Sequence, residues 1–208
     1  PTAETEGYVT ETRNDLANFA ARLESHITTR LAIGKQLRDG LVEGKIAGRE
    51  EFLEQTAYIH DLFTDFQAIN WIDSKGVIRW VSPIKGNEAA QNLNVHTIPP
   101  ADLAITEAAK TGRLQVTRPI ELTQGGGGFV AYIPIIKMER VTGFINIVFR
   151  TEPLMQAAMP ESLMNKHDVV LMDKDRRIYG TIDTMAGHDR VLSKWIVIGN
   201  RVWTVNLL

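Results

Sequence analysis

The sequence of 208 residues contains no cysteine. This absence excludes disulfide bonds, thiol catalysis and zinc–thiolate sites. It also suits an oxidising compartment, in which a free thiol is a liability. Cationic residues are not in excess either, because 23 Lys and Arg stand against 25 Asp and Glu. Nucleic-acid binders usually carry a basic excess or a basic stripe, so the composition argues against a nucleic-acid partner.

The sequence also lacks an apolar run long enough to cross a bilayer. Its longest uncharged stretch, Leu122 to Ile136, is interrupted by four glycines and a proline, and nothing resembles a signal peptide. The chain begins at Pro1 without Met and stops at Leu208 in an apolar, strand-like run. We therefore expect a segment of a longer protein, with membrane helices flanking it outside this sequence.

Hydrophobic residues are plentiful, at 44% of the chain, which is enough for a sizeable core and excludes an intrinsically disordered protein. From about Leu16 to Leu41 they recur at helical spacing. This pattern predicts one amphipathic helix of about 25 to 30 residues. A helix of that length either packs lengthwise on its own domain or pairs with a second copy through the same stripe.

Beyond this helix the pattern predicts two lobes of related α+β design, the second one smaller. Residues 169–178 repeat the pattern of residues 69–78, with an apolar strand, an Asp at the turn and an Ile five residues later. We expect helices at about 50–66, 99–111 and 154–159, the second of them stopped by Gly112. Strands are expected at about 68–72, 77–82, 114–122, 129–136, 142–149, 195–198 and 201–207.

Two motifs suggest ligand chemistry, but other residues that each motif requires are absent. The run Gly125–Gly128 leads into a strand and is followed by no Lys or Ser, so a strand connector or a pocket rim is favoured over a phosphate loop. Asp173-Lys174-Asp175 resembles the start of a calcium loop, but the sixth position is Ile178 instead of Gly. The five histidines share no metal-ligand spacing. We therefore expect no metal, no cofactor and no catalytic residue.

Four aromatic residues fall on predicted strands of one sheet: Trp71, Trp80, Phe129 and Tyr132. Most such residues belong to a core. Strand alternation places Arg79 opposite Ile78 and Trp80, among apolar neighbours. Arg79 is then either a solvent-facing residue or the polar anchor of a mostly apolar pocket, the kind of pocket that binds small molecules.

The first lobe resembles the CHASE domain, the extracytoplasmic sensor of membrane histidine kinases and nucleotide cyclases. The resemblance spans about 85 of the 208 residues, with several motifs in the same order. These motifs are Gln67–Asp73, Gly76–Pro83, Gly86–Glu88, Ala108–Gly112, Thr117–Ile120, Gly128–Pro134 and Gly143–Phe149.

The resemblance implies an α+β fold in which a long N-terminal stalk helix precedes two PAS-like lobes with antiparallel sheets. Residues 1–48 would form the stalk helix and link. Residues 49–158 would form the membrane-distal lobe that carries the ligand pocket, and residues 159–208 the smaller membrane-proximal lobe. The segment would be the periplasmic or extracellular part of an inner-membrane protein and a homodimer through its stalk helix.

The resemblance also bears on the pocket. The position of a pocket acid in the plant cytokinin receptors of this family is occupied by Asn94, and that of a pocket threonine by Tyr132. Both departures argue against a cytokinin ligand. We expect the ligand-binding residues to be Trp71, Arg79, Trp80, Asn94, Gly127, Gly128 and Tyr132, with Arg79 meeting a carboxylate or another acceptor.

The leading hypothesis is therefore a sensor of an unknown small molecule that belongs to a membrane receptor, with a histidine kinase as the first candidate and a diguanylate cyclase as the alternative. The segment itself would not be an enzyme. A second hypothesis is a ligand-free dimerisation module that uses the apolar stripe of the first helix as its seam. A third, an extracytoplasmic enzyme, would need a cluster of titratable groups that the sequence does not display.

Overall fold

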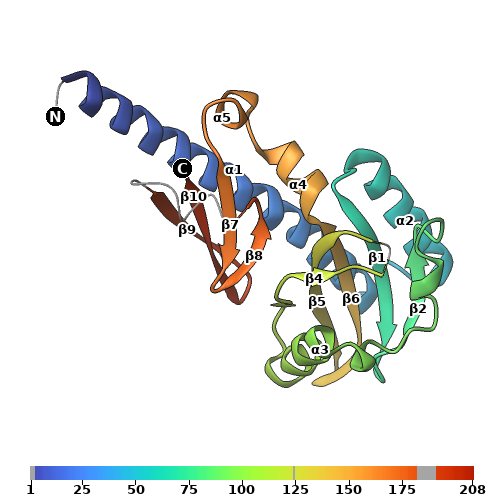
Figure 1. Cartoon of the computed structure of the whole chain (residues 1–208). Helices are drawn as coiled ribbons and strands as arrows, with labels where there is room; N and C mark the ends of the chain where they lie inside the picture. The colour runs from blue at the N-terminus through green and yellow to red at the C-terminus, as the bar shows by residue number, and fades with distance from the viewer. Residues whose placement is uncertain (1–2, 124, 182–190) are drawn as a thin grey trace. The chain divides into compact units, whose positions relative to one another are not determined.

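The computed structural model describes residues 3–123, 125–181 and 191–208, and the side chains from residue 6 onward. The chain forms two compact units, one of residues 1–28 and 155–208 and one of residues 29–154. The helix α1 (Ala3–Val42) contributes to both units (Figure 1). Each unit has its own antiparallel sheet, with six strands in the 29–154 unit and four in the other. The expected α+β class is confirmed.

Helix α1 is longer than the apolar pattern predicts, at 40 residues. Its apolar stripe is buried within the chain itself. The buried members of the stripe are Leu16, Phe19, Ala20, Leu23, Ile27, Leu31, Leu37 and Leu41. The stripe is therefore used for packing inside one chain, and it is not free to serve as the coiled-coil seam of the ligand-free dimer hypothesis.

The sheet of the 29–154 unit has the strand order β2-β1-β6-β5-β3, with β4 also paired to β5. Its long strands are fully buried in their centres, as expected for a sheet covered on both faces. The strands are β1 (Phe66–Asp73), β2 (Ile78–Ser82), β3 (Gln115–Val116), β4 (Ile120–Glu121), β5 (Gly127–Lys137) and β6 (Arg140–Arg150). The single strand expected at 114–122 is two short strands, because Pro119 lacks the amide N–H that a continuous ladder would need.

Helix α3 (Pro99–Thr111) covers one face of this sheet (Figure 1). It starts with Pro99 and Pro100 and ends at Gly112, whose φ of 68° places it in the left-handed region that glycine adopts most easily, as the sequence predicts. The short helices η1 (Glu88–Ala90) and η2 (Val95–Thr97) precede it. The helix and the sheet share a set of buried residues that we call the α3-face cluster: Ala68, Ile72, Ile78, Val81, Ala90, Val95, Ala101, Ala104, Ile105, Ala108, Leu122, Val130, Tyr132, Phe144 and Val148.

Helix α1 covers the other face of the same sheet. A Cβ added to Gly34 would come within 2.6 Å of Ile133 and Ile147, so the missing side chain lets the helix approach the strands closely. Helix α2 (Arg49–Leu62) also lies on this side, where its Phe52 ring contacts Trp80. The helix expected at 50–66 ends four residues early, because Phe66 is the first residue of β1.

A buried ion pair joins α1 to the start of β1. Arg30 donates from Nε to Asp65 Oδ2 at 2.9 Å and from Nη2 to Asp65 Oδ1 at 3.1 Å, and its guanidinium lies 4.6 Å from the centroid of the Phe63 ring. Two parallel hydrogen bonds fix both the distance and the orientation of the pair. This pair secures the chain between the end of α2 and the sheet.

The second unit repeats the hairpin of the first. It contains α4 (Thr151–Ala158, whose first turn belongs to the other unit), α5 (Glu161–Met164), β7 (Val169–Asp173), β8 (Arg176–Tyr179), β9 (Leu192–Ile198) and β10 (Arg201–Leu207), with strand order β8-β7-β10-β9. Asp73 and Asp173 end equivalent strands one hundred residues apart. Each accepts a hydrogen bond from an arginine on a later strand, Arg79 and Arg201.

Candidate functional site

A row of polar side chains crosses the centre of the α3-face side of the sheet. Tyr132 on β5 pairs in register with Asn146 on β6, which pairs with Asn70 on β1. Each of the three is at most 2% exposed. Because residues paired across antiparallel strands point to the same face, all three side chains lie on the side that α3 covers. On its other side the register extends this row to Gln115 of β3, which pairs with Tyr132 and is also buried.

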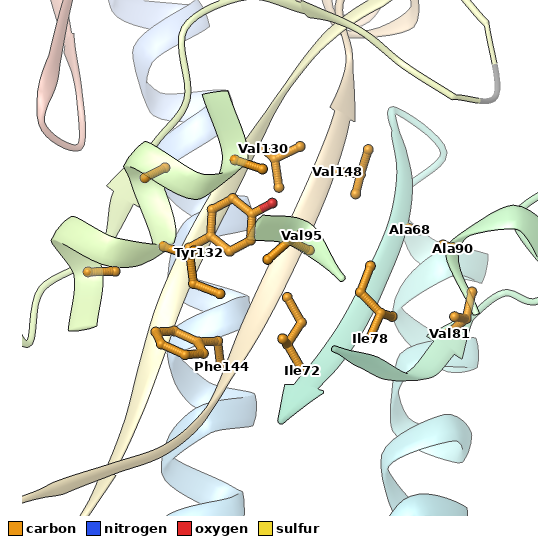
Figure 2. Packing of buried hydrophobic residues seen from close by; sticks show 14 of the residues in the cluster. Ala68, Ile72, Ile78, Val81, Ala90, Val95, Val130, Tyr132, Phe144 and Val148 are labelled. Carbon is orange, nitrogen blue, oxygen red and sulfur yellow. The ribbon is translucent and has the colours of Figure 1, made fainter. Parts of the chain in front are cut away.

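Not all hydrogen-bonding atoms of this row have a partner. Asn70 Oδ1 accepts the backbone N–H of Ser82 at 3.3 Å. The side chains of Tyr132 and Asn146 share a hydrogen bond, and burial raises the pKa of the Tyr132 hydroxyl far above its ordinary value. Asn146 Oδ1 is buried without a hydrogen-bond partner. Figure 2 shows the Tyr132 ring among Val130, Val95 and Phe144, with its hydroxyl end directed away from Phe144.

Asn70 and Asn146 were not among the residues that the sequence analysis singled out. A signal was present, because each Asn interrupts a strand of otherwise apolar residues, Ala68–Ile72 and Phe144–Val148. Buried polar groups need partners, so an Asn in the middle of a fully buried strand points to a specific hydrogen-bonding role.

Trp71 and Trp80 lie on the opposite face of the sheet. Their rings stack at a centroid distance of 4.4 Å, and Trp80 also contacts Phe52 of α2. Trp71 lies against Gly143, where an added Cβ would come within 3.3 Å of its ring. The structure therefore gives the two tryptophans a shared packing role, separated from Tyr132 by the thickness of the sheet.

The alternation expected along residues 77–82 is wrong at Arg79. The register pairs Trp71 with Trp80 and Ile72 with Ile78, so Arg79 is an extra residue in β2. Such a bulge shifts the alternation by one residue. Ile78 joins the α3-face cluster, while Trp80 points to the other face.

The Arg79 side chain lies near the β1–β2 turn and is 46% exposed. Its Nε donates to Asp73 Oδ2 at 2.7 Å and its Nη1 to Asn92 Oδ1 at 3.3 Å. Burial opposes ionisation of Asp73, but the Arg79 guanidinium and the N–H groups of Val77 and Lys75 outweigh it and lower the pKa of the Asp73 carboxyl. The charge of Arg79 is thus already matched by a carboxylate.

Asn94 borders the α3-face cluster at η2. Its Oδ1 accepts the backbone N–H of His96 at 3.0 Å, which makes it the N-cap of this short helix. Its backbone forms a bridge to Val77, and the next residue, Val95, belongs to the cluster. The Asn94 side chain is half-buried and occupied with capping.

The two glycines lie at the start of β5. Gly127 is exposed, and a Cβ added there would meet nothing within 4 Å. Gly128 is buried, and an added Cβ would clash with the Phe149 carbonyl oxygen and with Leu122. Gly128 is therefore required for the close approach of β5 to its neighbours.

Of the seven residues expected to bind ligand, the structure places Tyr132 within the α3-face cluster and Asn94 at its border. It does not bring them together with Trp71 and Trp80 on the other face, or with Arg79 in the bulge. Gly128 lies four residues before Tyr132, about 13 Å along the strand. The seven do not form one constellation.

In the described ranges, no group of three or more His, Asp or Glu residues has the geometry to hold a metal ion. None of the helices in those ranges combines the length and the hydrophobicity that a membrane span requires.

Comparison with known proteins identifies the family. The model of the CHASE domain matches residues 12–182, which is most of the chain. Among curated proteins, none has a matching sequence.

Solved structures share the fold at low sequence identity. A domain described as belonging to a sensory box/GGDEF family protein from Vibrio parahaemolyticus has a TM-score of 0.74 at 9% identity, covering 97% of this chain and 96% of its own. The ligand-binding domain of the Pseudomonas fluorescens chemoreceptor CtaA, in complex with L-serine, has a TM-score of 0.71 at 10% identity, covering 98% and 96%.

An extracellular ligand binding receptor from Desulfohalobium retbaense has a TM-score of 0.71 at 11% identity, and 93% of this chain covers 39% of that receptor. This chain thus spans about two fifths of one relative and nearly the whole of the other two. Their PAS-like architecture agrees with the helix and the two antiparallel sheets described above. The chain belongs to the CHASE domain family, whose members are extracellular, non-catalytic small-ligand sensor domains of signalling receptors.

Proposed function

We propose that the 29–154 unit binds a small molecule on the α3 face of its sheet, beside Tyr132, Asn146 and Asn70. The observation that carries this proposal is the row of buried hydrogen-bonding side chains within an apolar cluster, with one acceptor unmet. Ligand sites are typically apolar surfaces with a few placed polar groups. In a plain core, by contrast, a buried polar atom without a partner is unfavourable.

Asn94 and Gly128 border this face and complete the proposed site. Trp71, Trp80 and Arg79 support it from outside, because they fix β2 against β1, the strand that carries Asn70. Under this proposal their substitution changes stability more than ligand affinity.

The membrane context is also part of the proposal. We infer that the chain is the extracytoplasmic part of an inner-membrane receptor, held by membrane helices that flank this sequence. We propose a histidine kinase as the output domain. A diguanylate cyclase is the alternative, and the fold likeness to a GGDEF-family protein supports this alternative. The sequence that follows Leu208 in the parent gene distinguishes the two.

We further propose that the receptor is a homodimer in which α1 meets its counterpart through its solvent-exposed side. The apolar stripe of α1 is buried in its own chain. The exposed side includes Ala21 and Ala32, which would allow two helices to approach closely.

A ligand search tests the binding proposal. Small molecules released from the purified protein by denaturation are identified by mass spectrometry, and candidates are added back in a thermal-shift assay. At one hundred times its dissociation constant, a ligand stabilises the folded state by about 2.7 kcal/mol. The expected result is a compound that raises the thermal midpoint of the wild type but has less effect on Tyr132→Phe. Finding no compound that stabilises the protein would favour a ligand-free structural module instead.

A further inference from the structure

We propose that the ligand of the 29–154 unit is an uncharged molecule whose adjacent hydrogen-bond donor and acceptor meet Asn146 Oδ1 and the Tyr132 hydroxyl. Carboxamides, lactams and heteroaromatic rings with an N–H beside a ring nitrogen belong to this class. The inference rests on the proposed function, because it names the ligand chemistry of the same site.

The side-chain oxygen of Asn146 is a buried acceptor without a partner. Asn146 is 2% exposed, and its Oδ1 has no hydrogen-bond partner. Buried side-chain oxygens in native proteins almost always have a donor, so this oxygen calls for a partner that the chain does not supply. Water could fill this role only in a site roomy enough to give it several polar partners. The buried neighbours of the row are the apolar α3-face cluster and the polar Gln115, which pairs in register with Tyr132.

Tyr132 and Asn146 together present one donor and one acceptor. Since Asn146 Oδ1 is unpaired, the hydrogen bond that Asn146 makes with Tyr132 comes from its amide nitrogen, which can only donate. The Tyr132 oxygen therefore accepts, and its own O–H is left to donate to a third group. Burial raises the pKa of this hydroxyl, so it stays protonated at physiological pH. One donor and one acceptor are thus presented side by side.

The described part of the 29–154 unit has no unpaired buried charge. Within the described part of the 29–154 unit, the buried ionised side chains are Arg30 and Asp65, and they pair with each other. Near the cluster, Arg79 pairs with Asp73 and is partly exposed, and His96 Nδ1 lies 2.6 Å from Asp102 Oδ1. A ligand carboxylate or ammonium on this face would lose its hydration without finding an unpaired counter-charge among the buried residues that the structure describes. This chemistry favours a neutral ligand over a zwitterion.

Matched probes test the ligand class. The thermal midpoint of the full chain is measured with two isosteric pairs, nicotinamide against nicotinate and benzamide against benzoate, and with L-serine and GABA. The neutral amides are expected to raise the midpoint with increasing concentration, and the charged probes are expected to leave it unchanged. Asn146→Leu and Tyr132→Phe are expected to weaken amide binding by about 10- to 100-fold. Trp71→Phe, on the other face of the sheet, is the control that keeps binding.

A second measurement needs no ligand. Asn146→Leu removes an amide with an unmet oxygen, so it is expected to raise the thermal midpoint of the free protein by about 2–4 °C. Asn206→Leu is the matched control, because Asn206 is also buried, at 4% exposed, but its side chain bonds to Ser193 and to the Val170 carbonyl. This substitution is expected to lower the midpoint. If Asn146→Leu fails to fold or lowers the midpoint as much, the acceptor is not free and the inference is overturned.

The outcomes separate this inference from the binding proposal. Binding of L-serine, GABA or a carboxylate that survives Asn146→Leu would overturn the ligand class and leave a small-molecule sensor. No stabilisation by any probe, with no released compound that binds, would overturn both. Amide binding that is lost in Asn146→Leu and kept in Trp71→Phe supports both.

Discussion

Buried polar residues in this chain differ in how completely their hydrogen bonds are met. Arg30 and Asp65 satisfy each other with two parallel bonds, and Asn206 has a partner for both its oxygen and its nitrogen. Asn146, on a corresponding buried strand, lacks a partner for its oxygen. Buried polar groups that have hydrogen-bond partners contribute to a unique fold. A buried polar group without a partner lowers stability and is retained when function requires it.

His60 makes the stability of the chain depend on pH. Its Nε2 donates to the Ser82 carbonyl oxygen at 2.7 Å, and burial lowers the pKa of the imidazole below its ordinary 6.5, against the opposing effects of Ser82 and Asp61. As the pH falls, the unfolded chain takes up the proton first. The free energy of unfolding should therefore be highest above pH 6.5 and should decline until the pH passes the folded-state pKa.

Urea unfolding at pH 7.5, 6.5 and 5.5 checks this expectation. His60→Gln keeps an amide N–H that can bond to Ser82 but does not titrate. We expect its stability to fall less between pH 7.5 and 5.5 than that of the wild type. Equal losses in the two proteins would mean that another group causes the pH dependence.

At the scale of single elements, strand β5 shows that two adjacent glycines can have unlike roles. Gly128 faces the Phe149 carbonyl oxygen and Leu122 with no room for a Cβ, whereas Gly127 faces open space and does not have a positive φ. The four-glycine run was expected to be a connector or a pocket rim. Its last two glycines are part of the sheet, because Gly127 pairs with Glu121 and Gly128 pairs with Ile120 and Arg150.

Alanine substitution separates the two glycines. Gly128→Ala should lower the free energy of unfolding by about 1–3 kcal/mol, because the added methyl forces β5 away from its neighbours. Gly127→Ala should change it by less than about 0.5 kcal/mol. Chemical denaturation of both variants measures the difference. A Gly128→Ala protein as stable as the wild type would show that the strand can shift to admit a side chain.

At the scale of the whole molecule, α1 connects the two units. Phe19 and Leu23 of its buried stripe belong to the unit of residues 1–28 and 155–208, and Leu31 and Leu37 belong to the 29–154 unit. A helix shared in this way can pass a change in one unit to the other, provided that the ligand binds two arrangements with different affinity.

Single cysteines test the proposed dimer, since the chain has none of its own. In the parent receptor in membranes, Ala21→Cys and Ala32→Cys on the exposed side of α1 should form intermolecular disulfides under mild oxidation. Ala20→Cys, which is fully buried in its own chain, should not. Non-reducing electrophoresis gives the measurement. If both exposed positions fail to cross-link, the dimer does not form through this side of α1.

The sequence by itself determined the class, the long helix, the bounds of α3 and the repeated hairpins, because these depend on local periodicity and on residues such as Gly112 and Pro99. Only the tertiary structure decided which side chains meet. The bulge at Arg79 reverses the faces expected in β2, and the register of β5, β6 and β1 aligns Tyr132, Asn146 and Asn70. Register is set by pairing between strands distant in sequence, and a shift of one residue moves every side chain to the other face.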